Sequence, residues 1–444
     1  MSTIINTRSP FYKKISNASL FSAKLELSIW TGETSDKTSA DKKYTLKKQA
    51  IGSNTYVTFE LSKLIRDYMI TEYNNYATDT LWIETVVVIY NSSGGTVSTT
   101  TENYLAIDGY GYFEDGINPR TTTTPMILQE NTDVYYYDGQ DIKIPVFAEA
   151  ATITVSLQSS AGADVNWEAA DDFWNTYDGT WGSGDTDIDI IDDGNTNQKI
   201  QYVIIDDTDT LIDGDTVTFS SVKDSGTTTA TTTDKLIDGT QNFTSTVRVG
   251  DLVKNTTDST TATVTAVDSD TTLSLSADIM VSGEAYEIKY EADKVITLKK
   301  VNECKFTPLN IIFYNKYGAL QNMWFFKKST TNINITSEIF RNNIIDFDNS
   351  GGSPTYSLSK HQEKKFIANG KESITVNTGF YPEDHNEIVR QMMLSEQVWV
   401  YDGTNTLPIN LKSNSLQFKK SVNDKLISYT VQFDYAFDKI NNIQ

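Results

Sequence analysis

The sequence predicts a mainly β protein of several domains, with β-sandwich or barrel architecture, two short amphipathic helices and one inserted small β-barrel domain. Short runs of β-branched and aromatic residues alternate with turn clusters such as Asp213-Gly214 and Asp402-Gly403, a pattern typical of hairpins. The chain has 444 residues, which at roughly 150 residues per domain suggests about three domains. It also contains 24 Tyr, 19 Phe and 7 Trp, enough aromatic side chains to fill several hydrophobic cores.

Two kinds of segment support this fold class. Six segments are rich in the β-branched and aromatic residues that strands favour. A helix is expected over 61–70, where apolar residues recur at i, i+3, i+4 and i+7, and a second over 383–396. Glu383 and Asp384 lie in the first turn of the second helix, where the helix dipole favours negative charge. The six predicted strands are 56–59, 82–90, 142–147, 153–157, 202–205 and 398–401.

Changes in composition mark the domain boundaries. The threonine run before Pro125 is expected to form an exposed linker. The Ser/Thr/Gly tract after residue 216 is expected to form a flexible linker, because it cannot bury apolar surface. Clean alternation over 261–267 and 273–275 predicts the strands of the inserted barrel. The predicted parts are an N-terminal β domain with one helix (1–120), a linker (121–132), a second β domain (133–215 plus 291–310), a Ser/Thr/Gly linker (216–233), the inserted barrel (234–290) and a C-terminal β domain with one helix (311–444).

The charge of the chain excludes some partners. Lys and Arg total 37 against 59 Asp and Glu, a formal net charge of −22. A surface this negative repels phosphate backbones and anionic lipid, so we expect no nucleic-acid and no membrane partner. The longest apolar runs, such as 86–90, are too short to cross a bilayer. The N-terminus lacks the apolar core of a signal peptide, so we expect synthesis in a reducing cytoplasm.

Residues that commonly carry catalysis are scarce. Cys304 is the single cysteine, and His361 and His385 are the two histidines. His361 is expected in an exposed turn and His385 at solvent near the start of the second helix. No serine elbow and no phosphate-binding glycine loop is present. The sequence therefore predicts a protein that is not an enzyme, and we assign no catalytic residue.

An acidic segment and an aromatic segment are the remaining candidate sites. Asp185–Asp189 match the first positions of a calcium loop, but Ile190 replaces the required Gly and Thr196 the closing Glu. We therefore predict no cofactor and leave opportunistic calcium binding open. Five aromatic residues of an irregular loop are candidate interaction residues, since Trp and Tyr are enriched at subunit interfaces. These residues are Trp167, Phe173, Trp174, Tyr177 and Trp181.

Two sets of segments carry a resemblance to a known family. The first set is 8–12, 29–32, 64–68, 107–114, 315–328, 378–380, 394–399 and 435–437. These segments resemble uncharacterised virion structural proteins of tailed bacteriophages, particularly those that infect marine and Bacteroidetes hosts, and the resemblance spans about two thirds of the chain. The second set, 249–253, 261–264 and 282–286, resembles a module found in phage fibre and structural proteins.

The resemblance implies a non-enzymatic virion subunit of the tail, baseplate or neck. Its expected partners are copies of itself, arranged in a ring, and other virion proteins, with the virion as its location. An alternative is a host-receptor or glycan-binding tail fibre or spike, in which 234–290 would bind the host. A glycan-degrading enzyme is a third alternative, for which no carboxylate pair stands out among the 59 acidic residues.

Overall fold

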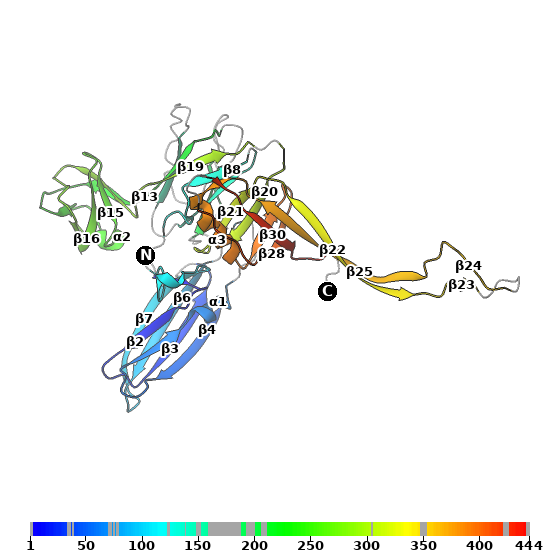
Figure 1. Cartoon of the computed structure of the whole chain (residues 1–444). Coiled ribbons are helices and arrows are strands. Elements are labelled where there is room, and N and C mark those ends of the chain that lie inside the picture. The colour runs from blue at the N-terminus through cyan, green and yellow to red at the C-terminus, as the bar shows by residue number, and fades with distance from the viewer. Residues whose placement is uncertain are drawn as a thin grey trace. The chain divides into compact units, whose positions relative to one another are not determined.

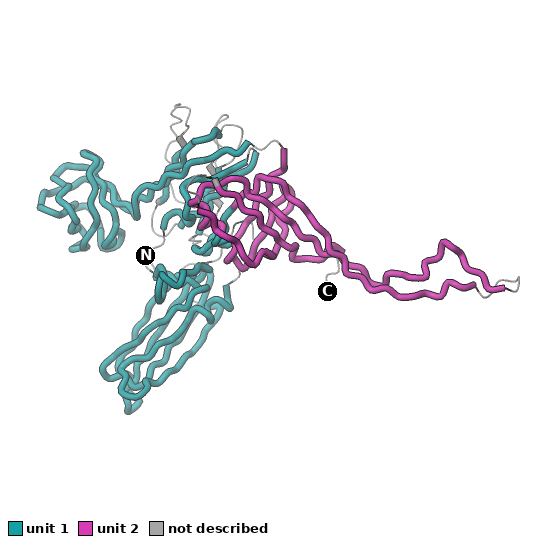
Figure 2. The backbone as a smooth tube through the Cα atoms, viewed as in Figure 1, with its two compact units in different colours: residues 1–302, 314–322, 390–392 teal, residues 303–313, 323–389, 393–444 magenta. Residues whose placement is uncertain are grey.

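The computed structural model of the chain is built mainly from β-sheets (Figure 1). The chain divides into two compact units (Figure 2): unit 1 comprises Met1–Asn302, Tyr314–Asn322 and Arg390–Met392, and unit 2 comprises Glu303–Phe313, Met323–Val389 and Met393–Gln444. The structure describes residues 3–32, 37, 40–69, 73, 76, 80–121, 125–137, 139–147, 152–158, 188–191, 200–205, 211–302, 305–346, 353–420 and 426–440.

The first sheet of unit 1 has five strands in the order β1-β7-β6-β3-β4. Strand β1 runs parallel to β7, and the other neighbours are antiparallel. In β3 the apolar residues Ala23, Leu25, Leu27 and Ile29 alternate toward the core, as a half-buried strand requires. The bounds of the strands are Thr3–Asn6 (β1), Ser22–Trp30 (β3), Lys42–Gln49 (β4), Leu81–Tyr90 (β6) and Thr96–Ile107 (β7).

A two-stranded sheet of β2 (Tyr12–Ser16) and β5 (Tyr56–Glu60) shares one hydrophobic core with the five-stranded sheet, which is consistent with a β-sandwich. The first predicted helix is present but shorter than expected, because α1 covers Ser62–Arg66. The amides of Tyr68 and Met69 bond three residues back, so the chain leaves the helix in tight turns.

A second core in unit 1 lies between two further sheets. One is three-stranded, in the order β11-β12-β9, and the other contains β10, β13, β19 and β8. Here β19 pairs with β8 in parallel and with β13 antiparallel. The bounds are Asp133–Tyr136 (β8), Ile142–Phe147 (β9), Thr152–Gln158 (β10), Ile188–Ile191 (β11), Ile200–Ile205 (β12), Thr216–Thr227 (β13) and Lys294–Lys300 (β19).

The segment 234–290 has its own core but continues the sheet of β13. Its strands follow the order β14-β17-β16-β15-β18, and β18 pairs with β13. This order is open, and no closed barrel is found among the described residues. The bounds are Lys235–Ile237 (β14), Leu252–Asn255 (β15), Thr261–Ser269 (β16), Thr272–Leu275 (β17), Ala285–Lys289 (β18) and Phe243–Thr246 for a short helix, α2, that the sequence analysis missed.

The prediction of a flexible linker over 216–233 is wrong for most of that segment, because residues 216–227 form the long strand β13. Val217 and Phe219 are fully buried in the second core, and the other end of the strand pairs with β18. Gly226 leaves room for its neighbours, since a Cβ there would lie 2.5 Å from Asp238 Oδ2. The first part of the tract therefore forms a strand, because it pairs with β10 and β19 at one end and with β18 at the other.

The predicted linker 121–132 also differs from the structure. Met126, Ile127 and Leu128 are buried, and the amide of Leu128 donates a 2.8 Å hydrogen bond to the carbonyl of Pro145 in β9. The segment is held because Met126 and Ile127 belong to the second core and because Leu128 bonds to β9 through its backbone. Residues 122–124 of the threonine run lie outside the described residues.

Unit 2 is built on a seven-stranded sheet in the order β21-β20-β27-β28-β30-β25-β22. Two further pairs are β23 with β24 and β26 with β29. With the two units taken together, the six strands predicted from the sequence are all present, five in unit 1 (β5, β6, β9, β10 and β12) and one in unit 2 (β27). The bounds are Leu309–Tyr314 (β20), Leu320–Phe325 (β21), Thr330–Arg341 (β22), Ile345–Asp346 (β23), Thr355–Tyr356 (β24), Glu363–Asn377 (β25), Tyr381–Pro382 (β26), Val398–Tyr401 (β27), Thr406–Leu411 (β28), Leu426–Ile427 (β29) and Thr430–Tyr435 (β30).

The second predicted helix is confirmed as a 3₁₀ turn over Glu383–His385 followed by α3, Asn386–Leu394. His361 is exposed as predicted, but the prediction for His385 is wrong, because its side chain is buried. The centroid of its ring lies 4.9 Å from that of Tyr381, and its Nδ1 lies 2.8 Å from Asp384 Oδ1. Among the described residues, no helix is long and apolar enough to cross a membrane.

A buried carboxylate in 234–290 leads to a prediction on pH. Asp238 accepts hydrogen bonds from Thr240 N at 3.0 Å and Tyr286 OH at 2.9 Å. Burial alone would raise the pKa of Asp238, but these hydrogen bonds outweigh it and lower the pKa below its ordinary value. The carboxylate therefore contributes stability above about pH 4, and this contribution is lost as the pH falls through the folded-state pKa.

Asp238→Asn should lower the opening free energy of β14 and β18 by about 1 kcal/mol at pH 7 and by less at pH 3. Hydrogen exchange followed by mass spectrometry measures this. Asp234→Asn, at an exposed position nearby, is the control. An equal loss at both pH values would contradict the assignment.

Candidate functional site

The longest strand pair of unit 2 continues beyond its sheet as a two-stranded arm. Strand β25 pairs with β30 over Ser373–Asn377, whereas its register with β22 runs from Thr375 out to Glu363. We define the arm as the described residues 333–346 and 353–372. In Figure 1 the two strands run on from the sheet toward β23 and β24.

The root of the arm is anchored firmly. Ile374 and Val376 of β25 are buried in unit 2. The C-terminal segment also holds the root, because Lys439 N donates to Gly370 O at 2.7 Å and Asn369 Nδ2 to Asp438 Oδ2 at 2.8 Å. The arm is therefore a continuation of folded sheet.

Beyond the root, the arm exposes large apolar side chains. Ile335 and Ile339 are each 60% exposed, Phe366 is 68% exposed and Leu358, near the tip, is 93% exposed. Such side chains are rarely gathered at the surface of a monomer unless the surface binds something. The other exposed apolar residues of the arm are Ile333, Phe340, Ile345, Tyr356 and Ile367.

Apolar residues lie on both faces of the arm. Because alternate residues of a strand point to opposite faces, Ile335 and Ile339 share one face and Phe340 lies on the other. The register shifts between Glu338 and Ile339, which leaves Phe366 as the extra residue of a β-bulge. The rings of Phe340 and Phe366 meet edge to face with centroids 6.3 Å apart.

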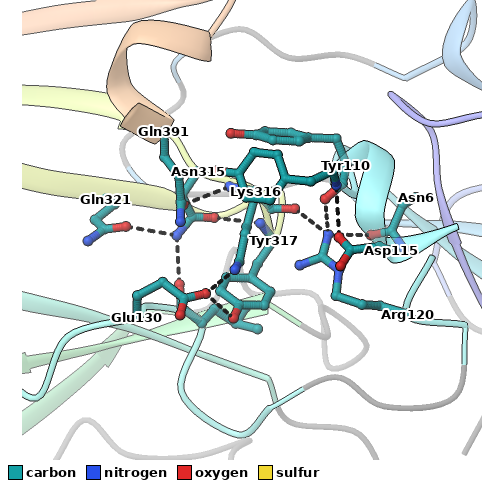
Figure 3. A network of polar contacts seen from close by, with 12 residues as sticks. Asn6, Tyr110, Asp115, Arg120, Glu130, Asn315, Lys316, Tyr317, Gln321 and Gln391 are labelled. Carbon is teal, nitrogen blue, oxygen red and sulfur yellow. Dashed lines mark hydrogen bonds and ion pairs between the residues drawn. The ribbon is translucent and has the colours of Figure 1, made fainter. Parts of the chain in front are cut away.

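A second cluster, the polar network in Figure 3, joins distant segments of unit 1. Tyr110 N donates a 2.9 Å hydrogen bond to Lys316 O. The turn that contains Lys316 approaches closely because Gly318 has φ +75°, and a Cβ there would lie 2.8 Å from the carbonyl carbon of Asp108. The segment 108–110 and the turn that contains Lys316 and Gly318 are thus in direct contact.

Asn315 is the buried centre of this turn. Its Nδ2 donates to Leu128 O at 2.6 Å and to Gln321 Oε1 at 3.1 Å. Its Oδ1 accepts hydrogen bonds from the amides of Tyr317 and Ala319 at 3.0 and 3.2 Å. One side chain therefore holds the turn, the neighbouring strand and the segment 126–128 together.

Glu130 and Lys316, two charged members of the network, pair with each other. Glu130 accepts a 2.6 Å hydrogen bond from Tyr317 OH and forms an ion pair with Lys316. Burial would raise the pKa of Glu130, but these hydrogen bonds and the charges of Lys316 and Arg120 lower it instead. Burial lowers the pKa of Arg120, whose Nη2 donates to Lys316 O at 2.7 Å and whose guanidinium lies 4.8 Å from the ring centre of Tyr317. These contacts are internal, so we interpret the network as a structural one that holds distant segments of unit 1 together.

The candidate sites named from the sequence are placed as follows. The loop residues Trp167, Phe173, Trp174, Tyr177 and Trp181 lie outside the described residues, as do Cys304 and most of the acidic segment 185–189. Among the described residues, no group of three or more His, Cys, Asp or Glu is placed to hold a metal ion. Sequence reasoning missed the arm, although the alternation Ile333-Asn334-Ile335 and the pair Lys364-Lys365 marked its strands.

No protein-family model matches the chain, and no curated protein matches its sequence.

Proposed function

We propose that the chain is a structural subunit of a tailed-phage virion, in the tail, baseplate or neck, that acts by binding other subunits. The single observation that carries this proposal is the arm, whose apolar side chains are exposed on both faces. The resemblance of the chain to virion structural proteins specifies the kind of assembly. The location in the virion, the ring arrangement and the sandwich and inserted-module architecture belong to the same proposal.

Energetics favour a partner for the arm. A two-stranded hairpin with both faces in water is at best marginally stable. Its outer strand edges also offer unpaired backbone groups, which can pair with another chain. Burying one Ile or Phe side chain contributes about 1.5–3 kcal/mol, so covering even two of them stabilises both the arm and a complex.

The proposal is tested by substituting apolar residues of the arm. In Ile335→Asn/Phe366→Asn both residues are exposed, so the global stability of the free chain should change by less than about 1.5 kcal/mol, most of it from loss of the Phe340–Phe366 ring pair. Incorporation into particles should fall about tenfold or more, because two apolar contacts are lost. The measurement is quantitative mass spectrometry of particles purified after complementation of a phage that lacks the chain.

Ile51→Asn is the matched control, because Ile51 is 82% exposed and lies far from the arm in the sequence. It should enter particles like the unmodified chain. Purified particles that lack the protein, or that contain the arm variant at an undiminished level, would contradict the proposal.

A further inference from the structure

The arm has two outer strand edges, and the edge formed by β25 is protected against pairing. This strand carries three exposed lysines, Lys364, Lys365 and Lys371, and the bulge at Phe366 interrupts its regular geometry. The C-terminal segment also bonds to its backbone at Gly370. Lysines, bulges and covering segments are the devices by which proteins keep an edge strand from pairing with another chain.

The other edge, formed by β22, has none of these devices. Among the described residues no strand pairs with its outer side, because β22 is the last strand of the seven-stranded sheet. Its twelve residues, Thr330–Arg341, include no Lys and no Pro, and the extra residue of the bulge belongs to β25. The chain protects a comparable edge elsewhere, since β4, the last strand of the first sheet, has Lys42, Lys43, Lys47 and Lys48 among its eight residues. The β22 edge is therefore suited to accept a strand.

A strand added to β22 must complement an apolar face. Ile333, Ile335 and Ile339 point to the same face of β22 and are 50%, 60% and 60% exposed. The neighbouring strand gives them little apolar cover, since Ile335 is opposite Gly370 and Ile339 is opposite Lys365. The occupant must therefore be a strand that has apolar residues at alternate positions and places no unfavourable charge opposite them.

The β22 strand of a second copy meets this requirement. When a two-fold axis relates two antiparallel neighbours, the axis passes through one residue of each strand, and residues equally far from it on opposite sides face each other. An axis at Thr336 places Ile333 opposite Ile339 of the second copy, at two equivalent positions, and keeps most of the strand paired. Glu338 then faces Asn334 of the second copy, so no like charges are opposed.

We infer that two copies of this chain associate through their β22 edges, which pair antiparallel and join the two arms into one four-stranded sheet. The inference rests on the proposed function and names a partner of the arm. Pairing satisfies backbone groups of both edges and replaces two marginal hairpins with a larger sheet. Charge does not oppose the contact, since residues 311–444 contain 14 Lys and Arg against 13 Asp and Glu. The contact is isologous, so it closes as a dimer, and a ring would need a further contact.

Complementary charges test both the partner and the register. The full chain should sediment as a dimer, and Ile333→Lys/Ile339→Lys should weaken the dimer by about tenfold or more, because lysines then face lysines. Ile333→Glu/Ile339→Glu should weaken it similarly. An equimolar mixture of the two variants should recover the dimer in sedimentation velocity, because each lysine then faces a glutamate. Recovery also shows that both variants fold.

Ile345→Lys/Ile367→Lys is the matched control, because it adds the same charges to exposed isoleucines of the arm that lie outside β22. This variant should dimerise as the unmodified chain does. An unmodified chain that is monomeric at every concentration, an equal loss in the control, or a mixture that stays monomeric would each overturn the inference.

Oxidative cross-linking of the full chain locates the axis. Cys304 is the single cysteine, so Cys304→Ser provides the background. Thr336→Cys should form disulfide-linked dimers, because the two copies of a residue on the axis lie within disulfide distance. Thr331→Cys, on the same strand, should not, because it would face Arg341 of the second copy. Equal linking at the two positions, or none at either, would overturn the inference.

Failure here differs from failure of the proposed function. A monomeric chain whose arm variants still fail to enter particles would show that the arm binds another virion protein, which overturns this inference and retains the proposed function. Absence of the protein from particles, together with a dimer that follows the charge pairing at 333 and 339, would overturn the proposed function and support the inference.

Discussion

Replacing Lys223 with Met should destabilise the segment 234–290 by about 3–5 kcal/mol. The Nζ of Lys223 lies 2.7 and 2.9 Å from the two carboxylate oxygens of Asp251, and the side chains are 4% and 7% exposed. Removing the ammonium leaves a buried carboxylate without its cation, which costs far more than the pair contributes. Hydrogen exchange of β15 and β18 measures the loss.

A second substitution tests this explanation. Lys223→Met/Asp251→Leu removes both charges, so it should be more stable than Lys223→Met alone, even though Arg248 N loses its acceptor on Asp251. Lys235→Met is the control, because its pair with Asp268 is about one-third exposed and should contribute less than about 1 kcal/mol. The explanation would be contradicted if the double variant lost as much free energy of unfolding as Lys223→Met and Asp251→Leu lose together.

Gly318→Ala should be the most damaging substitution in the polar network, at about 3–4 kcal/mol. Two costs combine at this position. The backbone has φ +75°, which an L side chain adopts at a cost of about 1–2 kcal/mol, and the new Cβ would lie 2.8–2.9 Å from backbone atoms of Asp108 and Gly109. The turn must then withdraw, which breaks the hydrogen bond between Tyr110 N and Lys316 O.

Gly94→Ala separates these costs. Gly94 has φ +83°, but a Cβ there would meet no atom within 4 Å, so this variant should lose only the conformational part. Urea denaturation, together with hydrogen exchange over 106–111, measures both variants. Equal losses would show that close packing at Gly318 contributes nothing.

Local structure was predictable where the pattern of side chains reports it. Alternation over 261–267 predicted β16, and the acidic first turn with its apolar stripe predicted α3. These signals are local, because side chains return to the same face every two residues in a strand and every 3.6 residues in a helix. The first helix was predicted too long, since a tight turn after Arg66 leaves no such periodic signal.

Pairing between distant segments was not predictable in the same way. The tract 216–233 has the composition of a linker, yet β13 lies between β10 and β19 at one end and beside β18 at the other. The glycine at 318 is explained by a segment about 200 residues away. Each outcome depends on a partner that is distant in the sequence.

The amino-acid sequence by itself determined the positions of the six predicted strands and of β16, the two main helices and the net charge of the chain, since these follow from side-chain spacing and composition. It did not determine β13 or the arm. Tertiary structure decided which apolar faces are covered. Ile374 and Ile335 belong to the same strand pair, but Ile374 is 4% exposed and Ile335 60%, because β30 accompanies β25 only at the root of the arm. Burial depends on the surface that neighbours remove from water, and those neighbours are chosen by long-range pairing.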